Sequence, residues 1–179
     1  MFDYQKSPMK LNIGCGSKIL AGFVNVDAAS NYSKIQPDVA CDISKELPFD
    51  AGSVDEAHAY HVLEHFLPFE VAQVLTDWRR VLKPGGLLVL EMPCFDKIMR
   101  HFAHQMLDGK PVGDEWKRGL YGDTRYRDEK MLHRWCYGVQ ELGDLLYEMG
   151  FEDVKLEKAQ THMEARDMRM TAIKPMEAT

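Results

Sequence analysis

The chain has 179 residues, which suits one domain with a full hydrophobic core and is too short for two complete catalytic domains. Its 45% hydrophobic and 28% charged residues exclude an intrinsically disordered protein. The formal net charge of -6 disfavours nucleic acid as a partner, because a phosphate backbone attracts basic surfaces.

The apolar runs are short, and four scattered cysteines show no metal or disulfide spacing. The run at residues 87–90 is far below the roughly 20 residues that span a bilayer. Residues 1–6 contain no apolar signal-peptide core. We therefore expect a cytoplasmic protein with reduced thiols and no membrane contact.

The first two predicted strands lie close together in the sequence. Residues 9–13 form an apolar run that breaks at Gly14 and Gly16, which predicts a strand entering a tight turn. Residues 23–26 are rich in β-branched side chains and end in Asp27. The second strand thus has a carboxylate at its end.

The same pattern continues over the next third of the chain. Residues 37–42 predict a third strand that ends in an acid, and residues 53–60 predict a fourth. Residues 70–82 have apolar side chains at helical spacing. We expect this helix to stop at residues 83–86, because a proline and two glycines there favour a reversal.

The remaining segments alternate in the same way. Residues 87–92 predict a buried central strand, and residues 94–137 lose regular periodicity and predict an inserted lid of mixed helix and loop. Residues 139–149 predict a helix, and residues 154–156 and 168–173 predict two last strands. This alternation indicates a doubly wound α/β sheet, in which ligands bind beyond the carboxyl ends of the strands.

Polar groups follow four predicted strands and should meet at that edge. Two glycines let the backbone approach a ligand closely, and Asp27 could accept both hydroxyls of a ribose. Asp42 could accept an amino group such as that of adenine, and Tyr60 and His61 follow the fourth strand. The pattern predicts an adenosine derivative as the ligand.

Two departures disfavour a dinucleotide and hence a nicotinamide oxidoreductase. Ile19 stands where the third glycine of the dinucleotide motif would fall. Asp27 comes 13 residues after Gly14 (27 − 14), where about 20 is usual.

Five blocks in chain order resemble the class I S-adenosylmethionine-dependent methyltransferases. The similarity runs from Lys10 to about Pro175 and is greatest to a small methyltransferase type 11-like group. The blocks are residues 11–16 (Leu-Asn-Ile-Gly-Cys-Gly), 25–27 (Asn-Val-Asp), 41–43 (Cys-Asp-Ile), 47–65 and 80–86.

This resemblance implies a three-layer sandwich around a mostly parallel seven-stranded sheet with the last strand antiparallel. We expect residues 1–179 to form one domain, with residues 94–137 as a lid or specificity insertion after the fifth strand. The implied cofactor is S-adenosylmethionine. The residues expected to contact it are Asn12, Gly14, Cys15, Gly16, Asp27, Asp42, Ile43, Tyr60 and His61.

The chain departs from the family at two places. The usual acid two positions before the first glycine is Asn12, so carbonyls of the glycine loop must bind more of the cofactor's ammonium group. Residues 17–22 are too few for a full first helix, so we expect a truncated helix or an irregular loop there.

A sulfonium methyl group is already activated, so the enzyme mainly holds an acceptor in line and excludes water. His61, Asp96 and His133 are the candidate general bases, with His133 favoured because Arg134 and Trp135 follow it. The alternatives are that Trp135 packs the lid, that His133 binds a backbone carbonyl and that Asp42 caps a turn.

A metal site is not expected. The spacing of His58, His61 and His65 would suit one helical face, but His58 lies in a strand-like segment.

The predicted function is methyl transfer from S-adenosylmethionine to a small-molecule or glycan-like acceptor. A catalytically silent binding module, or a subunit of a larger assembly, is the alternative. Methylation of nucleic-acid bases is disfavoured, because the chain lacks an Asn/Asp-Pro-Pro-aromatic signature and is acidic.

Overall fold

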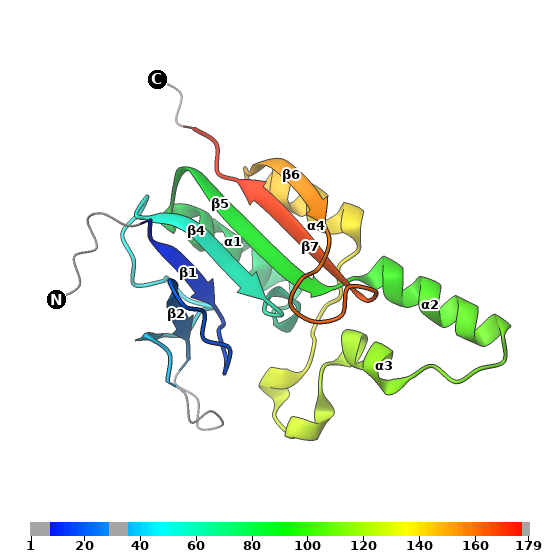
Figure 1. Cartoon of the computed structure of the whole chain (residues 1–179). Coiled ribbons are helices and arrows are strands. Elements are labelled where there is room, and N and C mark those ends of the chain that lie inside the picture. Colours follow the sequence, from blue (N-terminus) through cyan, green and yellow to red (C-terminus); the bar gives the residue numbers. More distant parts are fainter. Residues whose placement is uncertain (1–7, 29–35, 177–179) are drawn as a thin grey trace.

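The computed structural model describes residues 8–28 and 36–176, and its centre is a seven-stranded sheet (Figure 1). The strand order is β3-β2-β1-β4-β5-β7-β6, with β7 antiparallel to both of its neighbours and the other pairs parallel. The predicted sheet and its antiparallel last strand are therefore confirmed. The strands are β1 (Lys10–Ile13), β2 (Val24–Asp27), β3 (Val39–Ala40), β4 (Val54–Tyr60), β5 (Leu82–Pro93), β6 (Glu152–Glu157) and β7 (Asp167–Ile173).

The β1–β2 connection is an irregular loop, as its length predicts. Asn12 holds this loop: its side-chain Nδ2 donates to the Lys18 carbonyl at 2.8 Å and to Asn25 Oδ1 at 2.9 Å. Asn25 Oδ1 also accepts from the Leu20 N–H at 2.8 Å. Asn12 and Asn25 are each 2% exposed, so this buried amide pair fixes the loop against β1 and β2.

Two amphipathic helices, α1 (Pro68–Val81) and α4 (Val139–Glu148), lie behind the sheet in Figure 1. Their apolar stripes join one core with the sheet residues that face them, and Trp78 of α1 is completely buried there. Burying such side chains stabilises the fold by roughly 25 cal/mol per Å² of apolar surface. The core fixes the position of the strands whose ends carry the predicted site.

Helix α1 ends at Val81, directly before the predicted stop at residues 83–86, and Gly85 has the positive φ that a reversal there requires. Strand β5 begins at Leu82, directly after α1, and continues through both glycines. The Gly85 N–H donates to the Lys174 carbonyl at 2.8 Å, and the Lys174 N–H donates to the Gly86 carbonyl at 3.0 Å. These bonds pair the segment with the chain beyond β7. The register with β4 shifts from Leu82 to Leu87, so residues 83–86 form a bulge within the strand.

The segment from 94 to 137 mixes helix and loop, as its composition predicts. Helices α2 (Phe95–Leu107) and α3 (Asp114–Tyr121) extend beyond the carboxyl end of β5 (Figure 1). Two short 3-10 helices, η2 (Thr124–Tyr126) and η3 (Glu129–Met131), follow them. A third, η1 (Leu63–His65), lies directly after β4. The polar start predicted at residues 1–6 lies outside the described residues.

The sheet face opposite the core carries polar side chains. Glu56 of β4 binds Lys10 Nζ at 2.7 Å and His58 Nε2 at 3.0 Å. Arg169 of β7 binds Glu91 of β5 at 3.3 Å. This alternation of apolar and polar positions is expected for strands with one face against a core. None of the described helices is both long and apolar enough to cross a lipid bilayer.

Candidate functional site

Two glycines shape the backbone at the carboxyl end of β1. Gly14 and Gly16 have φ values of +67° and +51°, which glycine adopts without the steric cost of a Cβ. The N–H groups of Gly14 and Cys15 both donate to the Val26 carbonyl, at 2.8 and 3.1 Å. The glycine loop, residues 14–16, is thereby fixed to β2.

The ends of β1, β3 and β4 meet at Gly14. A Cβ at this position would lie 2.4 Å from Val62 Cγ2 and 3.3 Å from Ile43 Cδ1. Val62 follows β4 and Ile43 follows β3, so Gly14 is required for packing as well as for backbone conformation. By contrast, no described heavy atom lies within 4 Å of a Cβ on Gly16. Gly16 therefore borders open space.

Asp27 lies over the glycine loop, as predicted. Its Oδ2 accepts from the Gly16 N–H at 2.6 Å, and its Oδ1 accepts from the Ala28 N–H at 2.7 Å. Together with burial, the Asp27 charge raises the pKa of the neighbouring Cys15 thiol to about 11. Cys15 is consequently an inert, protonated thiol at neutral pH.

Asp42 caps the turn that follows β3. Its Oδ1 accepts from the Ser44 hydroxyl at 2.6 Å and from the Ser44 N–H at 3.0 Å, and these bonds lower the pKa of the carboxyl group. This is the capping role considered as the alternative for Asp42. The hydrogen bonds to Ser44 use Oδ1, so the cap does not exclude a ligand at Oδ2.

Tyr60 lies at the end of β4 among the polar side chains of the sheet. Its hydroxyl is 2.7 Å from His58 Nδ1, and the Arg169 guanidinium lies 5.8 Å from the centre of its ring. Burial raises the pKa of the Tyr60 hydroxyl. His58 belongs to this polar network, so it does not share a helical face with His61 and His65, as its strand-like pattern predicts.

His61 has a left-handed backbone, with a φ of +57°, and lies between two carboxylates. Its Nδ1 is 3.1 Å from Glu64 Oε1, and its Nε2 is 3.3 Å from Asp167 Oδ2. Burial lowers the pKa of His61, but Asp167 and Glu64 raise it more, to about 9. At neutral pH His61 is therefore a cation between two anions.

His133 lies where the 94–137 segment returns to the sheet. Its Nδ1 is 3.0 Å from the Gly119 carbonyl, and its Nε2 is 3.9 Å from Glu64 Oε1. The N–H groups of Arg134 and Trp135 both donate to the Glu64 carbonyl, at 2.7 and 3.2 Å. Burial lowers the pKa of His133. The structure thus brings His61 and His133 together around Glu64.

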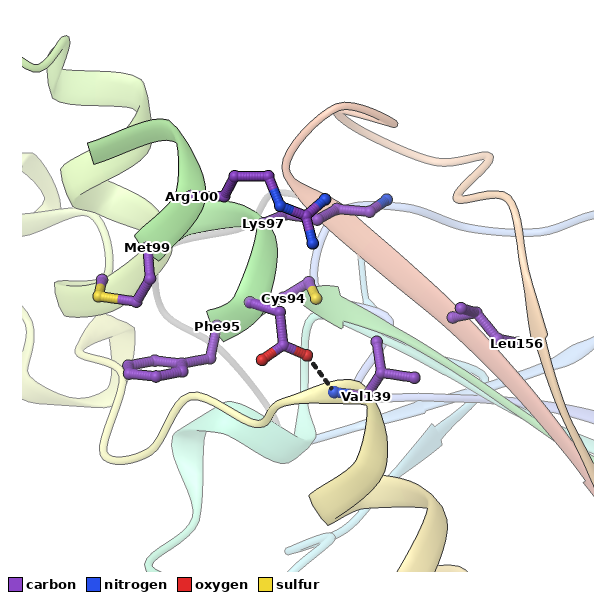
Figure 2. A pocket seen from close by; sticks show the side chains of 8 residues that line it. Cys94, Phe95, Lys97, Met99, Arg100, Val139 and Leu156 are labelled. Atoms are coloured by element: carbon purple, nitrogen blue, oxygen red, sulfur yellow. Dashed lines mark hydrogen bonds between the residues drawn. The ribbon is translucent and has the colours of Figure 1, made fainter. Parts of the chain in front are cut away.

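Asp96 lies in a different place, at a cavity of about 570 Å³ between α2, α4 and β6 (Figure 2). Its Oδ2 accepts from the Val139 N–H at 2.8 Å, the hydrogen bond drawn as a dashed line. Asp96 therefore stabilises the first turn of α4, where an anion also complements the helix dipole. Cys94, Phe95, Lys97, Met99, Arg100 and Leu156 line the rest of this cavity.

The sequence pattern did not identify Asp167 and His162 as site residues. Because β7 is antiparallel, its first residue, Asp167, pairs with Pro93 at the carboxyl end of β5. The β6–β7 loop carries His162, whose ring centre lies 4.3 Å from that of His61. This loop also reaches the glycine loop side, where Lys18 Nζ donates to the Thr161 carbonyl at 3.4 Å. No spacing along the chain reveals these contacts.

Comparisons with known proteins agree with this geometry. Residues 11–90 match a family model described as a methyltransferase domain. The chain is 32% identical over 155 residues to the probable methyltransferase ltbC of Aspergillus luteorubrus, covering 69% of this chain and 53% of that protein. It is 44% identical over 52 residues to an uncharacterized 37.1 kDa transposon protein of Streptomyces fradiae, covering 29% of this chain and 14% of that protein. The chain thus spans about half, or less, of these relatives.

Two solved structures share the fold. One is an S-adenosylmethionine-dependent methyltransferase from Methanosarcina mazei, with a TM-score of 0.63, 19% identity, and coverage of 97% of this chain and 95% of that one. The other is a 1,6-didemethyltoxoflavin-N1-methyltransferase from Burkholderia thailandensis with S-adenosylhomocysteine bound, with a TM-score of 0.62, 20% identity, and coverage of 94% and 72%.

Proposed function

We propose that this chain, which belongs to the class I S-adenosylmethionine-dependent methyltransferases, moves the methyl group of S-adenosylmethionine to a small-molecule or glycan-like acceptor. The observation that carries the proposal is the meeting of the glycine loop, Asp27 and Ile43 at one edge of the sheet. This edge, beyond the carboxyl ends of parallel strands, is where such folds bind nucleotide ligands.

The cofactor is held by groups from three strand ends. The ribose hydroxyls bind Asp27, whose oxygens have lone pairs beyond those used by Gly16 and Ala28. The adenine ring packs beside Ile43, and its amino group donates to Asp42 Oδ2. The glycine loop admits the methionine part closely because no described atom lies within 4 Å of the position that a Cβ on Gly16 would take.

Asn12 acts on the cofactor through the loop that it holds. Its amide nitrogen is used by the Lys18 carbonyl and Asn25, and its side chain is buried. Because Asn12 is neutral and its amide is already in use, carbonyl groups of the glycine loop are the acceptors for the cofactor's ammonium group.

The transfer is an in-line displacement at the methyl carbon. The bond from the acceptor atom to the methyl carbon forms as the methyl–sulfur bond breaks, and the electron pair leaves with sulfur as a neutral thioether. An acceptor hydroxyl or amine must also lose a proton. Of the three candidate bases, His133 has a ring nitrogen, Nε2, that no backbone carbonyl of the described residues occupies. Both nitrogens of His61 face carboxylates, and Asp96 accepts a hydrogen bond from the first residue of α4, so these two residues are less suited to accept the proton.

Residues 94–137 act as the lid that selects the acceptor. The support is that this segment leaves the sheet at the end of β5 and returns to it at Glu64, next to His61. Closure of such a segment over the site would exclude water from the reaction.

The proposal is tested by transfer of isotope-labelled methyl from S-adenosylmethionine over a panel of phenols, amines, carboxylic acids and sugars. We expect label in at least one acceptor class, together with stoichiometric S-adenosylhomocysteine. Retained cofactor affinity with no label moved to any class would show a binding module instead. Binding of a nicotinamide dinucleotide and not of either sulfur compound would contradict the family-based assignment of the cofactor.

A further inference from the structure

Glu64 is a buried carboxylate that shares its one close cationic neighbour among the described residues, His61, with Asp167. The residue is 1% exposed, and neither of its carboxylate oxygens accepts a hydrogen bond from any group in the described residues. His61 Nδ1 approaches Glu64 Oε1 to 3.1 Å, while His61 Nε2 faces Asp167 Oδ2 at 3.3 Å, so the charge of this ring is shared between two carboxylates. One imidazolium thus faces two buried carboxylates, and burying the remaining negative charge is costly unless a further cation or donor joins it.

Two histidines beside Glu64 each have one nitrogen fixed by a backbone carbonyl. His65 Nδ1 lies 3.0 Å from the Leu132 carbonyl, and His133 Nδ1 lies 3.0 Å from the Gly119 carbonyl. A carbonyl only accepts, so each Nδ1 carries the hydrogen and the lone pair of the neutral ring is on Nε2. This is the arrangement in which protein metal sites orient their histidine ligands.

The three side chains converge from two distant segments. Glu64 and His65 belong to η1, whereas His133 follows η3 in the returning insertion. One ligand atom of each residue lies within 4.8 Å of those of the other two, and His133 Nε2 is 3.9 Å from Glu64 Oε1. The His65 and His133 rings are perpendicular, with centres 4.9 Å apart. The Arg134 and Trp135 hydrogen bonds to the Glu64 carbonyl hold the two segments together.

We propose that Glu64, His65 and His133 bind one divalent first-row transition-metal ion, such as Zn²⁺, with a coordination position left open. Two imidazoles and one carboxylate are a preferred ligand set for such ions. Ligands at about 2.0–2.1 Å from a tetrahedral ion lie about 3.3 Å apart, so binding draws the three atoms closer. His61 supports Glu64 from the other side. The expectation of no metal considered His58, His61 and His65, and spacing could not reveal His133.

The ion would also act on the methyl acceptor, a consequence that rests on the proposed function. Its open position lies at the edge where the cofactor is proposed to bind, so it would hold an acceptor oxygen and help its hydroxyl to lose a proton. The Nε2 lone pair of His133 then binds the ion rather than the proton. The metal site itself depends on the geometry of the three side chains and not on methyl transfer.

The test is titration of the whole chain, freed of metal by a chelator, with Co²⁺ followed by its visible absorption, and then with Zn²⁺ in competition. We expect one equivalent of ion per chain. Removing a ligand should weaken binding at least about 100-fold, more than changes at supporting residues do. The variants are Glu64→Gln, which preserves the shape of the side chain, and His65→Ala. The matched control is His104→Ala, in an exposed part of α2, which should bind as the unmodified chain does.

Thermal unfolding with and without Zn²⁺ keeps the test valid if a variant folds poorly. Excess Zn²⁺ should raise the Tm of the unmodified chain and of His104→Ala, and leave that of His65→Ala unchanged. Less than one equivalent bound by the unmodified chain, equal affinity of Glu64→Gln, or loss of binding in His104→Ala would overturn the proposal. Calorimetry of S-adenosylhomocysteine in the presence of chelator separates failure of the metal site from failure of the cofactor site.

Discussion

Replacing Gly16 with alanine should weaken cofactor binding at a modest cost to folding. Gly16 has a φ of +51°, and a Cβ there meets no described atom within 4 Å. The cost to stability is therefore that of a left-handed alanine, about 1–2 kcal/mol. At about 2–4 °C per kcal/mol for a chain of this size, the Tm should fall by about 2–8 °C.

Gly22 is the matched control. Its φ is +81°, a Cβ there also meets no described atom within 4 Å, and it precedes β2 at the opposite edge of the sheet from Gly16. Gly22→Ala should lower the Tm by a similar amount. Because the added methyl group is far from the predicted cofactor, affinity should not change with it.

The assay is titration calorimetry of both variants with S-adenosylhomocysteine. If the backbone of the glycine loop contacts the cofactor, the methyl group of Gly16→Ala should weaken binding at least tenfold, about 1.4 kcal/mol. Gly22→Ala should stay within about twofold of the unmodified chain, a difference of less than half a kcal/mol. Equal affinities of the two variants, at similar losses of Tm, would refute the placement of the cofactor on the glycine loop.

Three further predictions concern stability and reactivity. Burial raises the pKa of Glu91, but bonds from Thr161, Gln160 and Arg169 lower it more, so the net shift is downward. The contribution of Glu91 to the free energy of unfolding should be full above the carboxyl's ordinary pKa and disappear as the pH falls through the lower folded value. In urea unfolding between pH 7 and pH 3, Glu91→Gln should therefore lose less stability on acidification than the unmodified chain. An unchanged pH profile would contradict this expectation. Trp78→Ala should cost about 3–5 kcal/mol in the same assay, because Trp78 is fully buried in the core; a loss under 1 kcal/mol would show that the core tolerates its removal. The Cys15 thiol, with its pKa raised from 9.0 to about 11, should react with iodoacetamide at pH 8 about 100-fold more slowly than in urea-unfolded chain, as measured by mass spectrometry, and equal rates would exclude a protected thiol.

The sequence predicted the parts of the fold that depend on local pattern. Gly14, Asp27 and Ile43 were assigned to successive strand ends, and the parallel sheet brings those ends together. The absence of a full first helix in residues 17–22 followed from the length of the connection alone. Local pattern and tertiary structure agree at these positions, as expected for a consistent sequence.

The parts that could not be predicted depend on contacts between distant segments. Asp167 reaches the site only because β7 runs antiparallel, and Glu64 gains its importance only when His133 returns from the insertion. The hydrogen bonds of the bulge at residues 83–86 to Lys174, about 90 residues further along the chain, have no signal in the local sequence. Local propensity contains no information on such pairings.

The central claim is that S-adenosylmethionine binds at the carboxyl edge through Asp27, and calorimetry with S-adenosylhomocysteine tests it most directly. Asp27→Ala removes the proposed ribose ligand, and hydrogen bonds to a charged group contribute about 1.5–3 kcal/mol, so affinity should fall by roughly 10- to 100-fold. The control, Asp50→Ala, makes the same charge change at an exposed position before β4, at the amino edge of the sheet, and should bind normally. No binding by the unmodified chain, or equal binding by Asp27→Ala, would contradict the account.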